Sequence, residues 1–371
     1  MTYKETLFFV AKCLTINHEE HNKRIVEEVL QSNTVDWDAI VKLSTAHFVF
    51  PALYCNLKRA SFLSYLPEEL VEYMKYITDL NRKRNEEILA QAEELNTLLL
   101  EHKITPIFIK GTGNLLEGLY EDIAERMVGD IDFLFSKEDY PRAIELLKDN
   151  GYPRELKTPI YPGLKHYPRM INKNKIAGIE IHNGLLIEQY AKEFDYNFIK
   201  ESIQKINGIS LLSFEDQLSL SIAASQINDF GFIDKVLSLR NAYDVFLLSK
   251  KTTAKNAFNK LNTLELPLHC FLASCFVVFN KPKSLQYNTT SKIEKYLVSF
   301  YKVIENRKLA EKNYKKTINK QYSNLIMRKF YKALFYEKYR KWLLRCIKNK
   351  QWRKEKIIQL VSIINNSLSK N

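Results

Sequence analysis

Two aspartates separated by a single residue are the strongest sign of chemistry in this sequence. The segment Ile131–Phe135 reads as a β-strand, and alternation places Asp130 and Asp132 on one face and Ile131 and Phe133 on the other. Strand rise then places the two carboxylates about 7 Å apart. Like charges so close are costly unless a cation neutralises them, and Mg²⁺ prefers carboxylates together with substrate phosphates. The pattern predicts a metal site, and a polar face on an edge strand is the alternative.

A single acid further along the chain supplies a third carboxylate. Glu180 lies between Ile179 and Ile181 in a segment that reads as a strand, and we expect this strand to neighbour the first. Three carboxylates suffice to hold two ions for an in-line phosphoryl displacement. His182 faces the same side as Glu180. A histidine there is more often a structural hydrogen-bonding group than a ligand, so we expect His182 to support the ligands from behind.

A glycine-containing turn precedes the aspartates. Lys110, Gly111, Thr112 and Gly113 follow the apolar run Pro106–Ile109, which is typical of a short buried strand, and they open a helical pattern. Glycine lets the backbone come close to a ligand, and free amides at a helix N-terminus attract phosphate. An ordinary structural turn between a strand and a helix is the alternative.

The elements around these residues predict an α+β protein that is mostly helical. Helical patterns fill residues 1–102, including a stripe formed by Ile88, Ala92, Leu95 and Leu99. Residues 103–212 form a compact α/β core with a small mixed sheet, in which 165–172 and 175–182 are expected to pair through a turn at 172–174. Helical patterns return over 213–300. Residues 301–371 form a separate basic helical region.

The motifs together resemble the nucleotidyltransferase superfamily of DNA polymerase beta. Its pattern is a glycine turn opening a helix, a strand with Asp-x-Asp, and a later strand with one acid. More narrowly, "IKGTGNLLEGLY", "ERMVGDIDFLF", "AIELLKDNGY" and "IEIHNGL" resemble a bacterial family of uncharacterised nucleotidyltransferases. The match is specific over residues 104–185 and looser on both flanks, where "STAHFVFPALYCNL" and "LRNAYDVFLL" resemble the surrounding helices of that family.

The resemblance implies roles for particular residues. Asp130, Asp132 and Glu180 would be catalytic and would bind two Mg²⁺ ions, with Mn²⁺ as the alternative. Lys110, Gly111, Thr112 and Gly113 would contact the triphosphate of the nucleotide, and Arg126 would meet phosphate charge. The superfamily usually has Ser or Gly where Thr112 stands, but the threonine hydroxyl can do the same work.

The implied reaction transfers a nucleoside monophosphate from a nucleoside triphosphate to a hydroxyl and releases pyrophosphate. The hydroxyl could belong to an RNA 3′ end, a protein or a small molecule, and the residues select neither the base nor the acceptor. A catalytically degenerate binding module is the alternative. A protein kinase is excluded, because the sequence has neither a glycine-rich loop upstream of Lys110 nor an H-R-D-like catalytic loop.

Positive charge is concentrated at the C-terminal end. The formal net charge is +13, but residues 301–371 alone carry 20 Lys and Arg against 4 Glu, so the first 300 residues are slightly acidic. Phe335, Tyr339, Trp342 and Cys346 are spaced as one face of a basic helix. This face could pack on neighbouring helices, bind nucleic acid such as RNA through charge and stacking, or attach to a membrane surface.

The remaining composition predicts a cytoplasmic protein. The five cysteines are scattered and form no Cys-x-x-Cys pair, which favours buried free thiols in a reducing compartment over a zinc site or disulfides. The N-terminal segment is charged and lacks the apolar stretch of a signal peptide. No apolar run approaches the roughly 20 residues of a transmembrane helix, although peripheral membrane contact stays open.

Overall fold

The N-terminal region is built from five α-helices. The computed structural model describes residues 1–155, 160, 164–258 and 261–358. The five helices are α1 (Tyr3–Cys13), α2 (Glu20–Gln31), α3 (Trp37–Ala46), α4 (Phe50–Arg59) and α5 (Glu68–Glu101), with a 3₁₀ turn η1 (Leu63–Tyr65) before α5. Pro51 lies in the first turn of α4, where its missing amide proton costs no hydrogen bond. The predicted stripe of Ile88, Ala92, Leu95 and Leu99 is buried.

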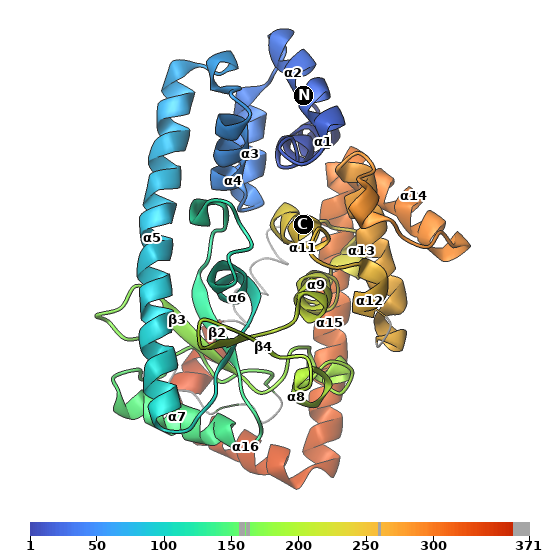
Figure 1. Ribbon diagram of the computed structural model, residues 1–371. Coiled ribbons are helices and arrows are strands. Elements are labelled where there is room, and N and C mark those ends of the chain that lie inside the picture. The colour runs from blue at the N-terminus through green and yellow to red at the C-terminus, as the bar shows by residue number, and fades with distance from the viewer. Residues whose placement is uncertain (156–159, 161–163, 259–260, 359–371) are drawn as a thin grey trace.

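A five-stranded mixed sheet follows α5. The strands are β1 (Ile107–Phe108), β2 (Asp130–Leu134), β3 (Gly178–His182), β4 (Gln204–Ile206) and β5 (Ile209–Leu211), and their order in the sheet is β3-β2-β1-β5-β4. The β2–β3 and β1–β5 pairs are parallel, whereas β1–β2 and β4–β5 are antiparallel. The prediction of a small mixed sheet in a mostly helical protein is confirmed. Figure 1 shows α5 along one side of the molecule and α15 along the other, with the sheet between them.

Short helices connect the strands. α6 (Lys110–Leu116) lies between β1 and β2, followed by the 3₁₀ turn η2 (Ile123–Glu125), and α7 (Asp139–Asp149) follows β2. The 3₁₀ turn η3 (Glu188–Tyr190) and α8 (Tyr196–Ile199) lie between β3 and β4. α6 contacts β2 and α7 contacts β3, so both helices cover strands that carry the predicted acids.

The described residues that follow β5 form mainly helices. The elements are α9 (Phe214–Ala223), a π-helix η4 (Ala224–Asn228), α10 (Gly231–Asp234), α11 (Leu239–Leu248), α12 (Ala254–Phe258), η5 (Asn262–Leu264), α13 (Glu265–Val278), η6 (Lys283–Leu285), α14 (Ser291–Glu305), α15 (Arg307–Phe335) and α16 (Glu337–Lys348). Within the described residues, no helix is both long and apolar enough to cross a bilayer. All five cysteines are free and buried, as expected.

Two elements of the core differ from the prediction. Residues 165–172 do not form a regular strand, although isolated bridges pair His166 with His182 and Met170 with Ile179 through the predicted turn. The β4–β5 hairpin was not predicted. Its signal was the Asn207-Gly208 dipeptide, whose two positive φ angles of 50° and 80° suit a two-residue turn between twisted strands.

The basic region differs as well, because the predicted stripe is divided between two helices. Phe335 ends α15 and is 67% exposed, whereas Tyr339 and Cys346 on α16 are buried. The chain leaves helical geometry at Tyr336, so Phe335 cannot share a face with the α16 residues. Packing therefore accounts for the α16 part of the stripe only.

Candidate active site

The parallel pairing of β2 with β3 places two of the predicted acids side by side. Asp132 on β2 lies directly opposite Glu180 on β3. Ile131, Phe133, Ile179 and Ile181 are fully buried and fix the register, because a slip by one residue would turn these side chains out of the core. The expectation that the two strands are neighbours is therefore confirmed.

Four side chains converge at this point. The Nζ atom of Lys110 lies 2.6 Å from Oδ1 of Asp132 and 3.8 Å from Oε2 of Glu180. Nε2 of His182 lies 2.8 Å from the same Asp132 oxygen and 3.5 Å from Oε2 of Glu180. His182 was expected behind the ligands, but its ring nitrogen reaches both carboxylates.

The donors of Asp132, Glu180 and His182 fit a divalent metal ion. One ligand atom from each lies within 4.8 Å of the other two. Carboxylate oxygens suit Mg²⁺ and Mn²⁺, and imidazole suits transition metals more than Mg²⁺. The Lys110 ammonium already stands between the two carboxylates, which shows that they accept a cation there.

Asp130 is held apart from this cluster by an ion pair with Arg169. Arg169 reaches it by crossing Gly178, where an added Cβ would lie 2.4 Å from the arginine Nε. Glycine at the start of β3 thus makes room for the guanidinium. Arg169 was not predicted; its signal was its place in 165–172, the segment expected to pair with the Glu180 strand.

The charges in the site shift the pKa values of its groups. Burial alone would raise the pKa of Asp132, but Lys110 and the His182 hydrogen bond hold it well below its ordinary value. Burial lowers the pKa of Lys110, yet Asp132 and then Glu180 outweigh burial and raise it. Burial raises the pKa of Asp130, and the Arg169 charge only partly offsets this. Asp132 and Lys110 are thus a stable ion pair over the neutral pH range.

The glycine turn supports the site through packing. Lys110 starts α6 with a φ of +57°, a left-handed conformation that costs a non-glycine residue roughly 1–3 kcal/mol and is common at functional sites. An added Cβ on Gly113 would lie 2.9 Å from the Phe108 carbonyl oxygen, and one on Gly111 would lie 3.1 Å from Val128. The Thr112 hydroxyl donates to the Asp130 carbonyl at 3.0 Å. Close packing and this hydrogen bond therefore hold α6 against β1 and β2.

Arg126 is engaged by a carboxylate of the helical region. Its Nε and Nη2 atoms lie 3.1 and 3.0 Å from Oδ2 of Asp244 on α11, and its side chain is almost fully buried. The Tyr120 hydroxyl donates to the other Asp244 oxygen at 2.7 Å. The predicted contact of Arg126 with phosphate stays a prediction, and in this structure its charge is balanced.

A polar pocket of about 230 Å³ opens beside the carboxylate cluster. It lies between α6, α9, η4 and α11, and Lys110 belongs both to its wall and to the cluster. Lys165, Asp229 and Arg240 also line it, and none of the three was predicted. Arg240 lies in the "LRNAYDVFLL" segment, which only pointed to a helix.

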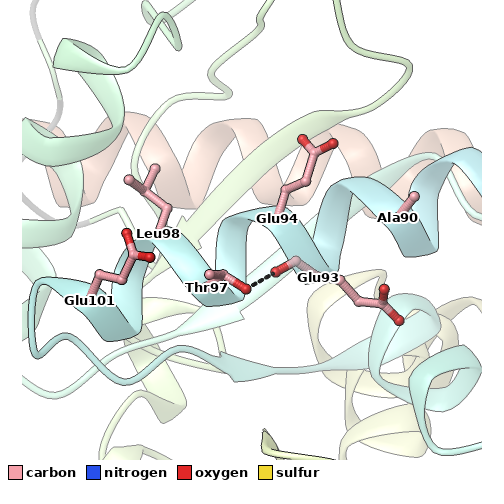
Figure 2. A pocket seen from close by; sticks show the side chains of 6 residues that line it. All are labelled: Ala90, Glu93, Glu94, Thr97, Leu98 and Glu101. Carbon is pink, nitrogen blue, oxygen red and sulfur yellow. Dashed lines mark hydrogen bonds between the residues drawn. The ribbon is translucent and has the colours of Figure 1, made fainter.

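A second depression lies on the outer side of α5, lined by Ala90, Glu93, Glu94, Thr97, Leu98 and Glu101. Figure 2 shows that all six side chains come from this one helix, with the Thr97 hydroxyl donating to the Glu93 carbonyl at 3.0 Å. A single helix face cannot enclose a ligand. None of these residues belongs to the carboxylate cluster.

Two solved structures are similar to this chain at low sequence identity. The crystal structure of JHP933 from Helicobacter pylori is 16% identical over 66% of this chain and 97% of that chain, with a TM-score of 0.29. A second H. pylori protein, assigned as a nucleotidyltransferase, is 17% identical over 61% of this chain and 96% of its own, also with a TM-score of 0.29. These scores are too low to bear on the site. No curated protein matches the chain.

The family model described as uncharacterised nucleotidyltransferase matches residues 33–279, a span that includes the sheet, the carboxylate cluster and the polar pocket. Because the match covers more than half of the sequence, the chain belongs to this nucleotidyltransferase family.

Proposed function

We propose that the protein is a metal-dependent nucleotidyltransferase that transfers a nucleoside monophosphate from a nucleoside triphosphate to a hydroxyl acceptor. The observation that carries the proposal is the position of Asp132 opposite Glu180, with a cation of the chain between them. Membership of the nucleotidyltransferase family supports this reaction type.

Asp132, Glu180 and His182 would hold one divalent ion. Asp130 would help to hold a second ion once its ion pair with Arg169 is broken. Bound ions of this kind neutralise charge on the triphosphate and on the leaving pyrophosphate. Lys110 adds a fixed positive charge beside the reacting phosphate, which favours the more negative transition state.

The reaction balances without a further reagent. The acceptor oxygen forms a bond to the α-phosphorus, the bond between the α-phosphorus and the bridging oxygen breaks, and pyrophosphate leaves with the bond electrons. The acceptor proton passes to a carboxylate. Between Asp132 and Glu180, Glu180 suits this role better, because its side chain is more exposed than that of Asp132, which already accepts from Lys110 and His182.

The basic region is the surface that we assign to the acceptor, and RNA is the acceptor class that fits it. Phe330, Tyr331 and Phe335 near the end of α15 are each more than half exposed, on a helix rich in lysine. Exposed rings among cations suit stacking on bases and contact with a phosphate backbone. Lys332 ties this part of α15 to Glu188, just beyond β3.

The test is to incubate the protein with each α-labelled nucleoside triphosphate, Mg²⁺ or Mn²⁺ and a whole-cell lysate. We expect the label to enter RNA, with release of one pyrophosphate per label. Label in protein or in a small molecule would retain the reaction and overturn the RNA assignment. The control is the double variant Asp130→Asn, Asp132→Asn, whose folding is checked by thermal melting.

A binding module that has lost catalysis is the second candidate, and one observation favours it. Both aspartates are already neutralised by cations of the chain, Asp130 by Arg169 and Asp132 by Lys110. In that case no labelled triphosphate would donate to any acceptor. Equal transfer by the folded double variant would instead show that the acids have no part in the reaction.

A further inference from the structure

The polar pocket beside the cluster is notable for its positive charge. Its charged lining consists of Lys110, Lys165, Arg126 and Arg240 against the carboxylates of Asp229 and Asp244. Two of these cations are already neutralised, Arg126 by Asp244 and Lys110 by Asp132. For Lys165 and Arg240 no ion pair is formed within the part of the chain that the structure describes, although the carboxylates of Asp229 and, for Arg240, Asp244 attract them from a distance.

Neither Lys165 nor Arg240 forms an ion pair with any described residue of the chain. Nε of Arg240 is buried without a hydrogen-bond partner, and its guanidinium carbon lies 5.1 Å from the centre of the Phe48 ring. Burial and the nearby Arg126 charge lower the pKa of Arg240, while burial and Lys110 lower that of Lys165. Burial is the larger cause of both shifts, and the neighbouring like charges add to it.

Both residues lie in backbone that is held by hydrogen bonds. The Lys165 carbonyl accepts hydrogen bonds from the amides of Asn183 and Gly184 at 3.0 and 3.1 Å, which fixes it to the end of β3. Arg240 lies in the first turn of α11, which is capped by Ser238. The opposite wall includes the π-helix η4, and π-helical turns are frequent at functional sites. Hydrogen-bonded backbone therefore forms three parts of the pocket wall.

We propose that Lys165 and Arg240 bind the β- and γ-phosphates of the nucleoside triphosphate in this pocket. The inference rests on the proposed function and assigns substrate contacts to two residues that the sequence did not single out. Lys110 joins the pocket to the carboxylates, so a triphosphate lying along it would keep its α-phosphate at Asp132 and Glu180. The pyrophosphate that leaves would stay on Lys165 and Arg240 after the transfer.

The chemistry of the two cations suits phosphate rather than the base. A guanidinium presents paired N–H donors that match two phosphate oxygens, and an ammonium meets a third as a point charge. Three of the amide side chains that line the pocket already donate hydrogen bonds inside the chain, although Oε1 of Gln217 has no partner among the described residues. Asn228 donates to the Leu185 carbonyl, Asn241 to that of Ser221, and Asn114 to the Tyr120 hydroxyl.

The experiment is calorimetric titration of the full chain with tripolyphosphate, with each nucleoside triphosphate and with a nucleoside monophosphate, all in EDTA. Arg240→Gln and Lys165→Gln are the test variants. Lys295→Gln, which removes one exposed charge from α14, is the matched control. We expect tripolyphosphate to bind the parent chain and the monophosphate to bind much more weakly. Each test variant should weaken tripolyphosphate binding by roughly tenfold or more, because each loses a charged hydrogen bond.

The outcomes separate this assignment from the proposed function. Unchanged tripolyphosphate affinity in the two test variants would overturn the pocket assignment, even with nucleotide transfer intact. Absence of tripolyphosphate binding to the parent chain would overturn it too. Tripolyphosphate binding that depends on Lys165 and Arg240, without any label transfer, would uphold the anion site and refute the transferase. The two variants lie on separate segments, so misfolding of one, detected by melting, leaves the other as the test.

Discussion

The ammonium of Lys110 lies 2.6 Å from the carboxylate of Asp132, inside the group of donors that suits a divalent ion. The chain thus brings its own cation to the place where we propose a metal. A buried carboxylate pair without a cation would be costly, so Lys110 stabilises β2 and β3 in the metal-free protein. It also means that a metal ion binds against the repulsion of a fixed positive charge.

Replacing Lys110 should therefore separate metal binding from catalysis. We expect Lys110→Met to bind Mn²⁺ roughly tenfold more tightly, because a like charge a few ångströms away is removed. Transfer should fall by roughly 10²–10³, because a charge aimed at the reacting phosphate is lost. Calorimetric titration with Mn²⁺ and the labelled-nucleotide assay measure the two effects, with Lys295→Met as the control. Weaker Mn²⁺ binding by the variant would show that Lys110 assists the metal.

The two glycines on either side of the site should differ in their tolerance of a side chain. We expect Gly113→Ala to lower the free energy of unfolding by about 1–3 kcal/mol, because its Cβ would press on the backbone oxygen of Phe108. Gly129→Ala should change it by less than about 1 kcal/mol, since an added Cβ there meets nothing within 4 Å. Urea denaturation measures both. Equal stability of the two variants would contradict the packing role of Gly113.

Stability should depend on pH through Glu117, which lies just after α6 and accepts a hydrogen bond from Gln204. Burial raises its pKa from 4.5 to about 7, against the opposing hydrogen bonds of Gln217 and Gln204. Below pH 4.5 the carboxyl is protonated in both the folded and the unfolded protein, so its burial as a charged group does not lower the free energy of unfolding. As pH rises from 4.5 through 7, the unfolded chain loses this proton before the folded chain does. The free energy of unfolding therefore falls by at most about 3 kcal/mol.

The variant Glu117→Gln removes this titration. Its melting temperature should exceed that of the parent chain at pH 8 and approach it at pH 5. A constant difference across this range would show that Glu117 titrates as an ordinary exposed carboxyl. Circular dichroism melting at a series of pH values is the measurement.

The exposed rings of α15 should contribute to RNA binding. We expect the double variant Phe330→Ala, Tyr331→Ala to bind single-stranded RNA more weakly, because base stacking contributes about 1–3 kcal/mol per base. Affinity of the parent chain should fall steeply with salt as counterions are released. Tyr76→Ala, which removes an exposed ring on α5, is the control. Flotation with anionic vesicles but no RNA binding would point to a membrane surface instead.

The sequence alone determined the local features of this protein. Asp130, Asp132 and Glu180 were recognisable because isolated acids within apolar strands have few roles other than chemistry. The strands β1 and β2, the stripe of α5 and the turn at 172–174 were readable because residue alternation, helical spacing and turn preference act over a few residues. The Asn207-Gly208 turn was equally local, and its signal was available in the sequence.

Only the tertiary structure decided which charges meet. Arg126 reaches Asp244 across 118 residues, β5 joins β1 rather than β2, and Arg240 comes to the pocket from α11. Such partners are chosen by the packing of whole elements and by the cost of leaving buried charge unbalanced, which no short segment encodes. By spacing alone, Asp130 and Asp132 were two equivalent metal ligands. The fold distinguishes them, pairing Asp130 with Arg169 and bringing Asp132 to Lys110, Glu180 and His182.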